Sequence, residues 1–475
     1  MSLTPCNEDY EKWHLRRQIQ SIALKELRKE VQRRKMYQGK ESHEIEQRLL
    51  SMAEVVTRYT AGLGLFEILL SDRRLEDIYV DAPCETNPIH VTISGLSKNS
   101  SFLRCTTNII VDEREIRAFV ARMKFHSGRA FSQAFPILET DIPGFDSRAT
   151  VIGSPLSPQG IALALRRHSP EPWTLMRLVN SGMIDCHTAA LISFLIDGRS
   201  TILICGPRGA GKSTLLGAIL FEFPPGQRIL TIEDTLELPI RQMQSMGYKV
   251  QSLVINNSGQ VNLESAAEEA LRVSLRMGES AIVLGEVRGR EAQVLYDGMR
   301  TGKAGSSVLG TIHGESAVSV YERVVHDMGI APEAFLATDA VLTIGLIRPR
   351  GSQKPTRKLI EISEVVRGRP GDFRNIINFH ENGCSDILKN GSQLIDKIAQ
   401  SWNISFQEAL ENVCARARMR EILLNNAIKR SMDFLSPGWT RRANSHLWEG
   451  IEKGKDLFEI VQEFEMLVKE GEVQS

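Results

Sequence analysis

In the first part of the chain, hydrophobic residues recur at the spacing of an α-helix. Over residues 10–58, apolar side chains such as Ile19, Ile22 and Ala23 stand close together on one helical face among many charged residues. This spacing predicts one or two amphipathic helices in an N-terminal region of residues 1–60. Residues 11–35 hold nine Lys or Arg against three Glu, so the polar face is basic. A solvated helix face is the simplest explanation, and contact with an anionic membrane surface or an acidic partner is the alternative.

The pattern becomes β-rich between residues 61 and 168. Short runs of β-forming residues surround one helical segment at residues 114–125. We therefore predict a separate α+β domain over residues 61–168. Its predicted strands cover residues 78–80, 89–93, 108–111 and 162–165. Pro170 and Pro172 disfavour regular structure after this domain, so we place a linker at residues 169–174.

Residues 175–370 contain apolar strands that alternate with helices, after two helical segments at 175–179 and 187–196. The predicted strands cover residues 201–205, 228–232, 281–284, 307–310 and 340–347. Alternation of this kind predicts an α/β domain, with a parallel sheet covered by helices on both faces. Residues 371–475 return to a helical pattern, strongest at 406–430 and 446–469, which predicts a C-terminal helical extension.

Composition narrows the class of protein. At 475 residues, the chain is long enough for roughly two to four domains. Its formal net charge is zero, which gives no general reason to expect a nucleic-acid partner. Seven cysteines include no Cys-x-x-Cys pair, so we expect a reducing compartment and no zinc site. We expect no signal peptide, and the longest apolar stretch, residues 189–205, is too short and too charged to cross a bilayer.

A glycine-rich loop is the clearest chemical motif. The pattern Gly-x-x-x-x-Gly-Lys-Ser follows the strand at 201–205 and precedes a predicted helix at 213–221. Glycines let backbone N–H groups approach phosphates, and the start of a helix favours negative charge. Lys212 is expected to reach the β- and γ-phosphates of ATP, and the Ser213 hydroxyl is expected to bind Mg²⁺. The predicted nucleotide-binding residues are Gly206, Pro207, Arg208, Gly209, Ala210, Gly211, Lys212, Ser213 and Thr214.

Carboxylates end the next two predicted strands. Glu233 and Asp234 follow strand 228–232, at the edge where parallel sheets bind ligands. A carboxylate there can deprotonate an attacking water, although the pair alone is equally explained by a helix cap or loop. Glu286 follows strand 281–284 in the position expected to hold Mg²⁺ through water, and Gly285 stands where many such ATPases have an aspartate.

One histidine follows a further strand. His313 comes shortly after the strand at 307–310. An isolated histidine at a strand end is more often structural than catalytic. The three neighbouring motifs favour a catalytic interpretation here.

Together these stretches resemble the type II and type IV secretion-system ATPase superfamily, which includes the motors of pili and of the archaeal flagellum. The resemblance covers about residues 62–368 and rests on the P-loop, the Ile-Glu-Asp-Thr acidic box, the Gly-Glu-Val-Arg-Gly run and the Thr-Ile-His box. It implies a RecA-like P-loop ATPase core, a preceding PAS-like α+β domain, and ATP and Mg²⁺ as cofactors. It also implies that Glu233 is the catalytic carboxylate, Glu286 the magnesium-side carboxylate and His313 a sensor of the γ-phosphate.

The sequence departs from the family pattern in two places. Ser306 occupies the position of an earlier histidine in the histidine box. The tetracysteine zinc insert of the bacterial secretion ATPases is also missing. The missing insert, together with the Gly-Thr-Ile-His-Gly-Glu run at residues 310–315, resembles an archaeal-type or tight-adherence-type branch.

Arginines form a further set of candidate catalytic residues. Arg148 closes the run Phe-Asp-Ser-Arg, which resembles the arginine turn in the preceding domain of such motors, and Arg166 resembles an arginine at a later basic strand end. An arginine delivered to the γ-phosphate stabilises the charge of the transition state. Arg272 and Arg276, four positions apart, are predicted to share one face of the helix before Glu286.

The resemblance implies a cytoplasmic hexamer, peripherally associated with the membrane, that docks on a polytopic inner-membrane platform protein. It is expected to power assembly or retraction of a type IV pilus-like filament, or protein secretion. A RecA-like nucleic-acid translocase or conjugation-type ATPase is the first alternative, although no nucleic acid is expected. A nucleotide switch without productive hydrolysis is the second, and the presence of Lys212, Ser213, Glu233 and Glu286 argues against it.

Overall fold

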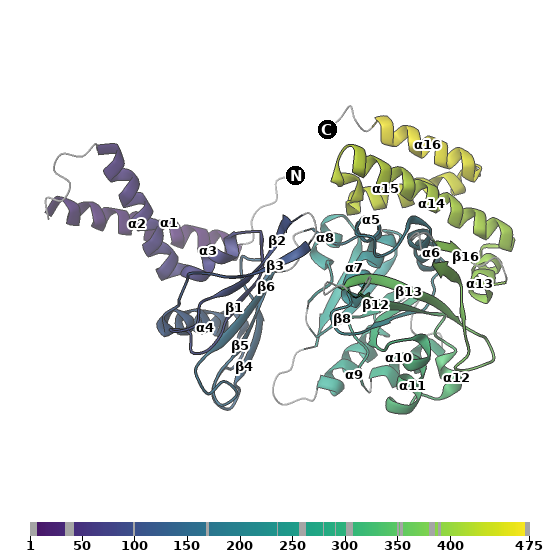
Figure 1. The fold of residues 1–475 in the computed structure, drawn as a ribbon, viewed down its shortest axis with the longest axis horizontal. Helices are drawn as coiled ribbons and strands as arrows, with labels where there is room; N and C mark the ends of the chain where they lie inside the picture. The colour runs from purple at the N-terminus through teal and green to yellow at the C-terminus, as the bar shows by residue number, and fades with distance from the viewer. Residues whose placement is uncertain are drawn as a thin grey trace. The chain divides into compact units, whose positions relative to one another are not determined.

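A computed structural model describes most of the chain, and it divides into two compact units. The described residues are 7–33, 42–97, 100–167, 171–234, 236–255, 263–278, 280–289, 291–300, 307–348, 351, 355–379, 385–387 and 391–470. The two units cover residues 1–170 and 171–475. Both are shown in Figure 1.

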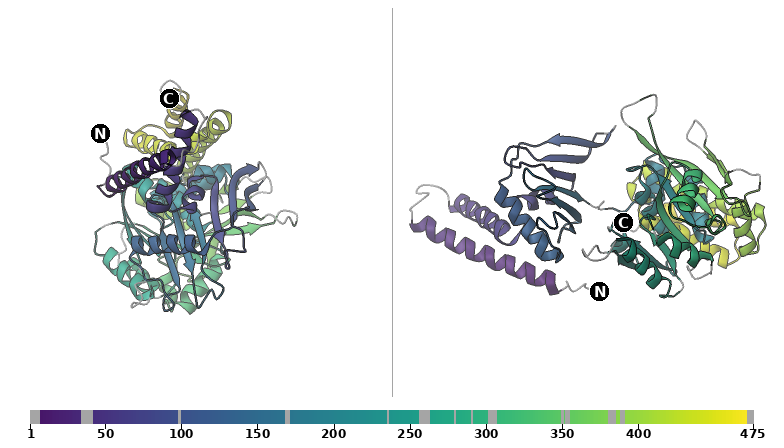
Figure 2. Two further views of the ribbon diagram at one scale, coloured as in Figure 1. Left: turned by 90° about the vertical axis from the view of Figure 1, so that its left-hand side faces the viewer. Right: turned by 90° about the horizontal axis from the view of Figure 1, so that it is seen from below.

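The first unit consists of a helical hairpin and a small α+β domain. Its elements are α1 (Asn7–Arg33), α2 (Ser42–Ala61), α3 (Leu65–Ser71), β1 (Leu75–Val80), β2 (His90–Ser97), β3 (Ser100–Thr106), α4 (Glu113–Ser127), β4 (Ile137–Asp141), β5 (Ser147–Ile152) and β6 (Ala162–Arg167). The strands form one antiparallel sheet in the order β3-β2-β1-β6-β5-β4. Helices α1 and α2 lie side by side (Figures 1 and 2).

Helix α4 closes the core of this unit. The Asp112 side chain accepts a hydrogen bond from the Arg114 N–H and so caps the first turn, and Gly128 ends the helix in a left-handed conformation. Phe119 packs on Phe66 of α3 with ring centroids 4.7 Å apart. Both rings are buried against the sheet, so α3 and α4 fix one face of the domain.

One predicted strand of this domain is wrong. Residues 108–111 are not a strand, and β3 lies just before them. The Thr107 hydroxyl accepts a hydrogen bond from the Ile109 N–H at 3.1 Å, a local bond that competes with strand pairing. The segment is apolar because Val111 is buried in the core. An apolar run of this length resembles a strand in the sequence, which explains the wrong prediction.

The second unit contains a large sheet. Its elements up to the last sheet strand are α5 (Leu175–Asn180), α6 (Cys186–Asp197), β7 (Ile202–Gly206), α7 (Lys212–Ile219), η1 (Leu220–Glu222), β8 (Arg228–Glu233), α8 (Ile240–Ser245), β9 (Lys249–Val254), α9 (Leu263–Ser274), β10 (Ala281–Leu284), α10 (Glu291–Arg300), β11 (Ser307–His313), α11 (Ala317–Glu322), η2 (Arg323–Asp327), α12 (Pro332–Phe335), β12 (Ala340–Ile347), β13 (Thr356–Val365) and β14 (Phe373–Asn375). The strand order is β14-β13-β12-β7-β11-β10-β8-β9. The strands from β12 to β9 in this order are parallel, and β13 and β14 are antiparallel.

Alternate residues of each central strand enter two different cores. Ile202 and Ile204 of β7 pack in the core formed with α5, α6, α7, α13 and α14. Leu203 and Cys205 pack in the opposite core, with α9 to α12. Both faces of the sheet are therefore covered, as Figure 1 shows. This confirms the predicted α/β class with a parallel sheet between two helical layers.

The C-terminal region differs from the prediction in two ways. It does not begin as helix, because β14 is followed by a small hairpin of β15 (Ile377–Phe379) and β16 (Ser385–Ile387). The helix predicted at 446–469 is divided between α15 (Pro437–Glu452) and α16 (Leu457–Glu470). Gly454 adopts a left-handed conformation (φ 71°) between them, and the Lys455 N–H donates to the Gly450 carbonyl at 3.0 Å. This backbone arrangement ends a helix.

The remaining C-terminal helices are part of the second unit. They are α13 (Gln393–Trp402), α14 (Phe406–Lys429) and the short η4 (Met432–Leu435). Ile398 of α13 and Val413 of α14 belong to the same core as α6 and β7. No described helix in either unit has the length and apolarity to span a membrane.

Candidate functional site

The glycine-rich loop joins β7 to α7 in a conformation that requires glycine. A Cβ atom on Gly206 would lie 2.5 Å from the carbonyl oxygen of Ile344 on β12. Gly211 has φ of 100°, a backbone conformation that other residues rarely adopt. The loop therefore turns tightly into the helix, and backbone N–H groups at a helix start are suited to binding an anion.

Lys212 begins α7 and folds back over this loop. Its Nζ donates to the carbonyls of Gly206 at 2.9 Å and Pro207 at 3.2 Å. Burial lowers the pKa of Lys212, and the nearby Glu286 carboxylate opposes this shift. Ser213 and Thr214 follow in the first turn of the helix. The nine predicted nucleotide-binding residues therefore extend from the last residue of β7, through the loop, into the first turn of α7.

Glu233 is the last residue of β8 and is almost completely buried, with 2% of its surface exposed. Its Oε1 accepts hydrogen bonds from the backbone N–H groups of Glu237 at 2.8 Å and Leu238 at 3.0 Å. Its Oε2 is buried and has no hydrogen-bond partner among the described residues. Burial raises the pKa of Glu233 to about 7. A carboxylate with this pKa and a free oxygen is suited to accept a proton near neutral pH.

Glu286 and His313 meet beside the loop. Parallel pairing aligns the ends of β10, β11 and β7, and His313 lies opposite Gly206 in the register of β11 with β7. The Nε2 of His313 lies 3.0 Å from Oε1 of Glu286. This contact is an ion pair when His313 is protonated, and within the described part of the chain no group forms a hydrogen bond with the buried Oε1. Burial lowers the pKa of His313, and the charge of Lys212 lowers it further.

Gly285 leaves space for the Glu233 side chain. Its N–H donates to the carbonyl of Ile232 at 2.8 Å, which draws the two strand ends together. A Cβ atom on Gly285 would lie 3.2 Å from Cγ of Glu233. An aspartate at this position would crowd Glu233, which gives a physical reason for the unusual glycine.

Arg288 connects the two carboxylate segments. One terminal nitrogen lies 2.9 Å from Oδ2 of Asp234, and the other pairs with Oε2 of Glu286. In the sequence, Arg288 is part of the Gly-Glu-Val-Arg-Gly run, which predicted no role for it. The available signal was an arginine two positions after a carboxylate at a strand end. Because Arg288 pairs with Oε2 of Glu286, the other oxygen, Oε1, is the one that lies next to His313.

Arg148 and Arg166 form a cross-strand pair in the first unit. Arg148 lies in β5, directly opposite Arg166 of β6. Directly opposed residues lie on the same face of a sheet. Asp77 of β1 is opposite Arg166, with its Oδ1 3.8 Å from the arginine Nε. Both arginines belong to the unit of residues 1–170, so a role at the P-loop stays a prediction.

The predicted arrangement of Arg272 and Arg276 is wrong. Helix α9 ends at Ser274, so Arg272 is helical while Arg276 lies in the turn that follows. The Arg276 N–H donates to the Val273 carbonyl at 2.9 Å, which closes this turn. Arg272 pairs with Glu268 on its own helix at 2.7 Å. The two arginines therefore do not share a helix face.

Two residues of the sequence motifs lie outside the described residues. They are Thr235 of the acidic box and Ser306, at the position of the missing histidine. The linker residues Ser169 and Pro170 also lie outside them.

Comparison with known proteins decides the family. The model of the type II/IV secretion system protein family matches residues 139–438, more than half of the chain. The chain belongs to this family. The predicted superfamily is thereby confirmed. The match begins later than the predicted resemblance at residue 62 and extends beyond its end at 368, into α15.

Relatives of this chain are found in bacteria and archaea. A putative conjugal transfer protein of Mycobacterium tuberculosis is 29% identical over 347 residues, covering 71% of this chain and 94% of the relative. An uncharacterized protein of Methanocaldococcus jannaschii is 28% identical, covering 66% of this chain and 53% of its own. Among solved structures, the pilus retraction motor PilT with bound ADP aligns at 20% identity and a TM-score of 0.45, covering 62% of this chain and 82% of its own.

Proposed function

We propose that the P-loop edge of the large sheet binds and hydrolyses ATP, and that the chain is a hexameric motor. The observation that supports this most directly is the convergence of Lys212, Glu286 and His313 at one strand edge. Glu286 Oε1 and Glu233 Oε2 are buried there without hydrogen-bond partners among the described residues. A buried polar atom without a partner is costly, and a bound ligand, ion or water that completes its hydrogen bonding is one explanation for it.

Each residue has a distinct role in this proposal. Lys212 releases the loop carbonyls and binds the β- and γ-phosphates. Glu233 Oε2 accepts a proton from the attacking water, since burial already holds its pKa near neutrality. His313 contacts the γ-phosphate side of the site and reports its presence through Glu286, which lies 3.0 Å away.

The donor set also suits a magnesium ion. Ser213 would supply a hydroxyl ligand from the first turn of α7, and Glu286 Oε1 would bind through water. Mg²⁺, when bound with ATP, neutralises the charge that develops on the phosphates. The carboxylate and hydroxyl groups are of the oxygen class that this ion prefers.

The motor is proposed to work on the cytoplasmic face of the membrane. We propose that a polytopic platform protein holds the ring there, and that the ring drives filament assembly or retraction, or protein secretion. The basic helix α1 is a candidate membrane-side contact. Deletion of residues 1–40 is expected to weaken binding to vesicles and to the platform, and full-strength binding would contradict this part of the proposal.

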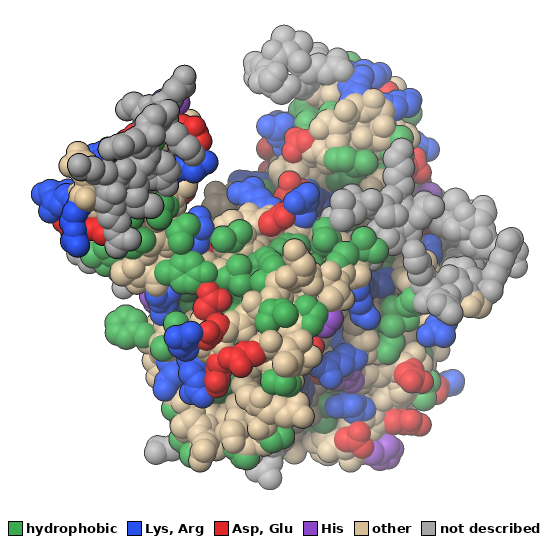
Figure 3. All heavy atoms as spheres, turned by 60° about the vertical axis from the view of Figure 1, so that its left-hand side comes forward, with side chains coloured by type: hydrophobic (Ala, Val, Ile, Leu, Met, Phe, Trp, Pro, Cys, Tyr) green, Lys and Arg blue, Asp and Glu red, His purple; other side chains and the backbone are tan. Residues whose placement is uncertain are grey.

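A conjugation-type motor is the second candidate. It is favoured by the similarity to the putative conjugal transfer protein of Mycobacterium tuberculosis. Against a direct nucleic-acid motor, the formal net charge of the chain is zero, whereas a nucleic-acid channel needs a basic surface. Figure 3 shows acidic as well as basic side chains on one face. Stimulation of ATP turnover by DNA, lost as salt rises, would favour this second candidate.

The hydrolysis proposal is tested with Lys212→Ala. The variant is expected to lose ATP turnover while the melting temperature stays unchanged, because the hydrogen bonds of the Lys212 side chain to described residues are those to the two loop carbonyls. Lys249→Ala is the matched control, since Lys249 is exposed on the edge strand β9. Wild-type turnover in Lys212→Ala would overturn the assignment of the site.

A further inference from the structure

A second cation reaches the P-loop from β13. Arg357 lies near the start of β13, opposite Leu346 of β12. Its Nε donates to the carbonyl of Gly209 at 3.1 Å, although the two residues are 148 positions apart. Its Cδ would lie 3.5 Å from a Cβ atom built on Gly211. The side chain therefore runs across the loop from Gly209 toward the start of α7.

The charge of the Arg357 guanidinium is not neutralised by a carboxylate in the described structure. Among the described residues no carboxylate forms an ion pair with it, and Gly209 is the hydrogen-bond acceptor given for its guanidinium. The terminal nitrogens of the fork remain able to donate. A guanidinium presents several donors in fixed geometry and suits the two oxygens of a phosphate group.

The order of the strands indicates which part of a nucleotide Arg357 meets. Strand β7, which carries the loop, lies between β11 and β12. The proposed hydrolytic groups Glu233, Glu286 and His313 follow β8, β10 and β11, all on one side of β7. Arg357 comes from β13, on the other side. The reacting γ-phosphate belongs with the hydrolytic groups, so Arg357 faces the rest of the nucleotide.

We propose that Arg357 binds the α- and β-phosphates of the nucleotide within its own subunit. This inference rests on the proposed function of the P-loop. The arginine releases the Gly209 carbonyl and turns its terminal nitrogens to the diphosphate, as Lys212 releases the loop carbonyls on the other side. Because the α- and β-phosphates are present in both ADP and ATP, the contact contributes equally to binding of both nucleotides.

The proposal predicts a change in affinity without a change in the chemical step. An interaction made equally in the ground state and the transition state raises KM when it is lost and leaves kcat unchanged. In Arg357→Ala, the Kd of ADP and the Kd of a non-hydrolysable ATP analogue are each expected to rise by about 10-fold or more, since bonds to charged groups are among the stronger ones. KM for ATP rises by a similar factor and kcat stays within about twofold. Arg357→Lys is expected to lie between Arg357→Ala and the wild type.

The experiment uses the full chain and fluorescent analogues of AMP, ADP and ATP. Arg369→Ala removes another exposed arginine, beyond the opposite end of β13, and serves as the control. Lys212→Ala reports whether the P-loop is the binding site. If the wild type binds no nucleotide, the proposed function fails. If it binds ADP and Arg357→Ala binds ADP equally well, only this inference fails. A loss of kcat with unchanged KM would also overturn it, because the arginine would then act at the γ-phosphate.

Discussion

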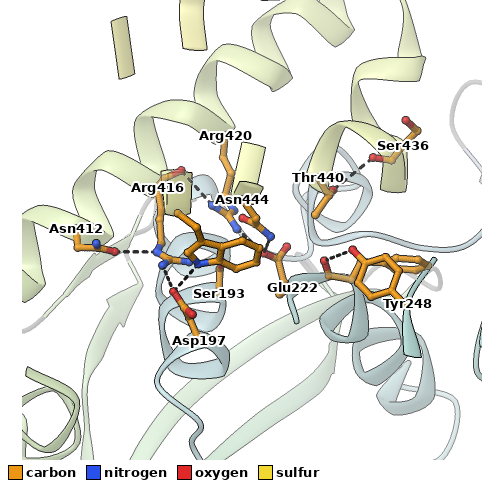
Figure 4. Close-up of polar contacts among 12 residues, drawn as sticks. Ser193, Asp197, Glu222, Tyr248, Asn412, Arg416, Arg420, Ser436, Thr440 and Asn444 are labelled. Carbon is orange, nitrogen blue, oxygen red and sulfur yellow. Dashed lines mark hydrogen bonds and ion pairs between the residues drawn. The ribbon is translucent and has the colours of Figure 1, made fainter. Parts of the chain in front are cut away.

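Glu222 and Arg420 form a buried ion pair at the far end of the P-loop helix. The Arg420 side chain donates to Oε2 of Glu222 at 2.7 Å, and the two side chains are 4% and 1% exposed. Asn444 of α15 donates to the same oxygen at 2.8 Å. Figure 4 shows these contacts between η1, which continues α7, and the C-terminal helices. The helix that begins at the phosphate loop is therefore bonded, at its other end, to α14 and α15.

A second buried pair lies next to the first. Arg416 of α14, which is 1% exposed, pairs with Asp197 of α6. The Asp197 Oδ2 also accepts from the indole N–H of Trp448 at 2.9 Å. Both pairs join the C-terminal helices to the ATPase core (Figure 4). Buried charges at this junction are stable only as long as both partners are present.

Removing one member of the Glu222–Arg420 pair is expected to destabilise the fold. Arg420→Met leaves the Glu222 carboxylate buried without its cation, which costs about 3–5 kcal/mol in known cases. The double variant Glu222→Leu with Arg420→Met removes both charges and is expected to recover most of the loss. Melting temperatures of the full chain measure the effect, with the exposed neighbour Arg418→Met as control. Additive losses in the double variant would contradict a coupled pair.

Glu233→Gln is expected to abolish most hydrolysis while nucleotide affinity stays nearly unchanged. A general base acts on the water and not on the ground-state phosphates. Since Glu233 must be ionised to accept a proton, kcat/KM of the wild type is expected to rise with pH through about 7. In Glu286→Gln, kcat/KM is expected to keep the same rise with pH through about 7. If Glu286→Gln shows the loss of hydrolysis and Glu233→Gln does not, the two roles are exchanged.

The same pKa predicts a pH dependence of stability. The folded-state pKa of Glu233 is raised from an ordinary 4.5 to about 7. Between these values the unfolded chain is ionised while the folded chain holds the proton. The contribution of Glu233 to stability therefore falls as pH rises from 4.5 to about 7 and is constant above. Glu233→Gln is expected to gain stability relative to the wild type over this interval, and an equal difference at pH 5 and pH 8 would contradict this.

Gly285→Ala is expected to slow hydrolysis by displacing Glu233. The added methyl group would stand 3.2 Å from Cγ of Glu233, whose carboxylate is already fixed by two backbone N–H groups. Small displacements of catalytic groups are costly, and we expect a loss of about 10-fold in kcat. Gly226→Ala is the control, since a Cβ atom there meets no atom within 4 Å. Equal turnover in both variants would show that the site tolerates the methyl group.

Arg148→Ala is expected to bind ATP and assemble but to hydrolyse slowly. If Arg148 stabilises the transition state as arginine fingers do, the loss is on the order of a thousandfold. Mixing Arg148→Ala with Lys212→Ala subunits distinguishes the two geometries, because activity recovers only if the arginine acts across a subunit boundary. Arg104→Ala, an exposed arginine of β3 in the same unit, is the control. Undiminished turnover by Arg148→Ala alone rules out the finger role.

The sequence by itself predicted the parts of the structure that depend on local spacing. Strand β7 is buried on both faces, so its apolar residues are consecutive and the strand is recognisable without knowing its neighbours. The P-loop is contiguous in the chain, and its glycines are required by its own backbone. Glu286 and His313 were found because each follows such a strand.

The tertiary structure alone decided the contacts between distant segments. Arg357 reaches Gly209 and Arg420 reaches Glu222 because the order of the strands and the packing of α14 bring those segments together. An exposed arginine in a strand and a buried one in a helix look alike in the sequence. The chain pattern shows which residues are apolar, but the partner of a charged side chain depends on long-range packing, and this is why both contacts could not be predicted.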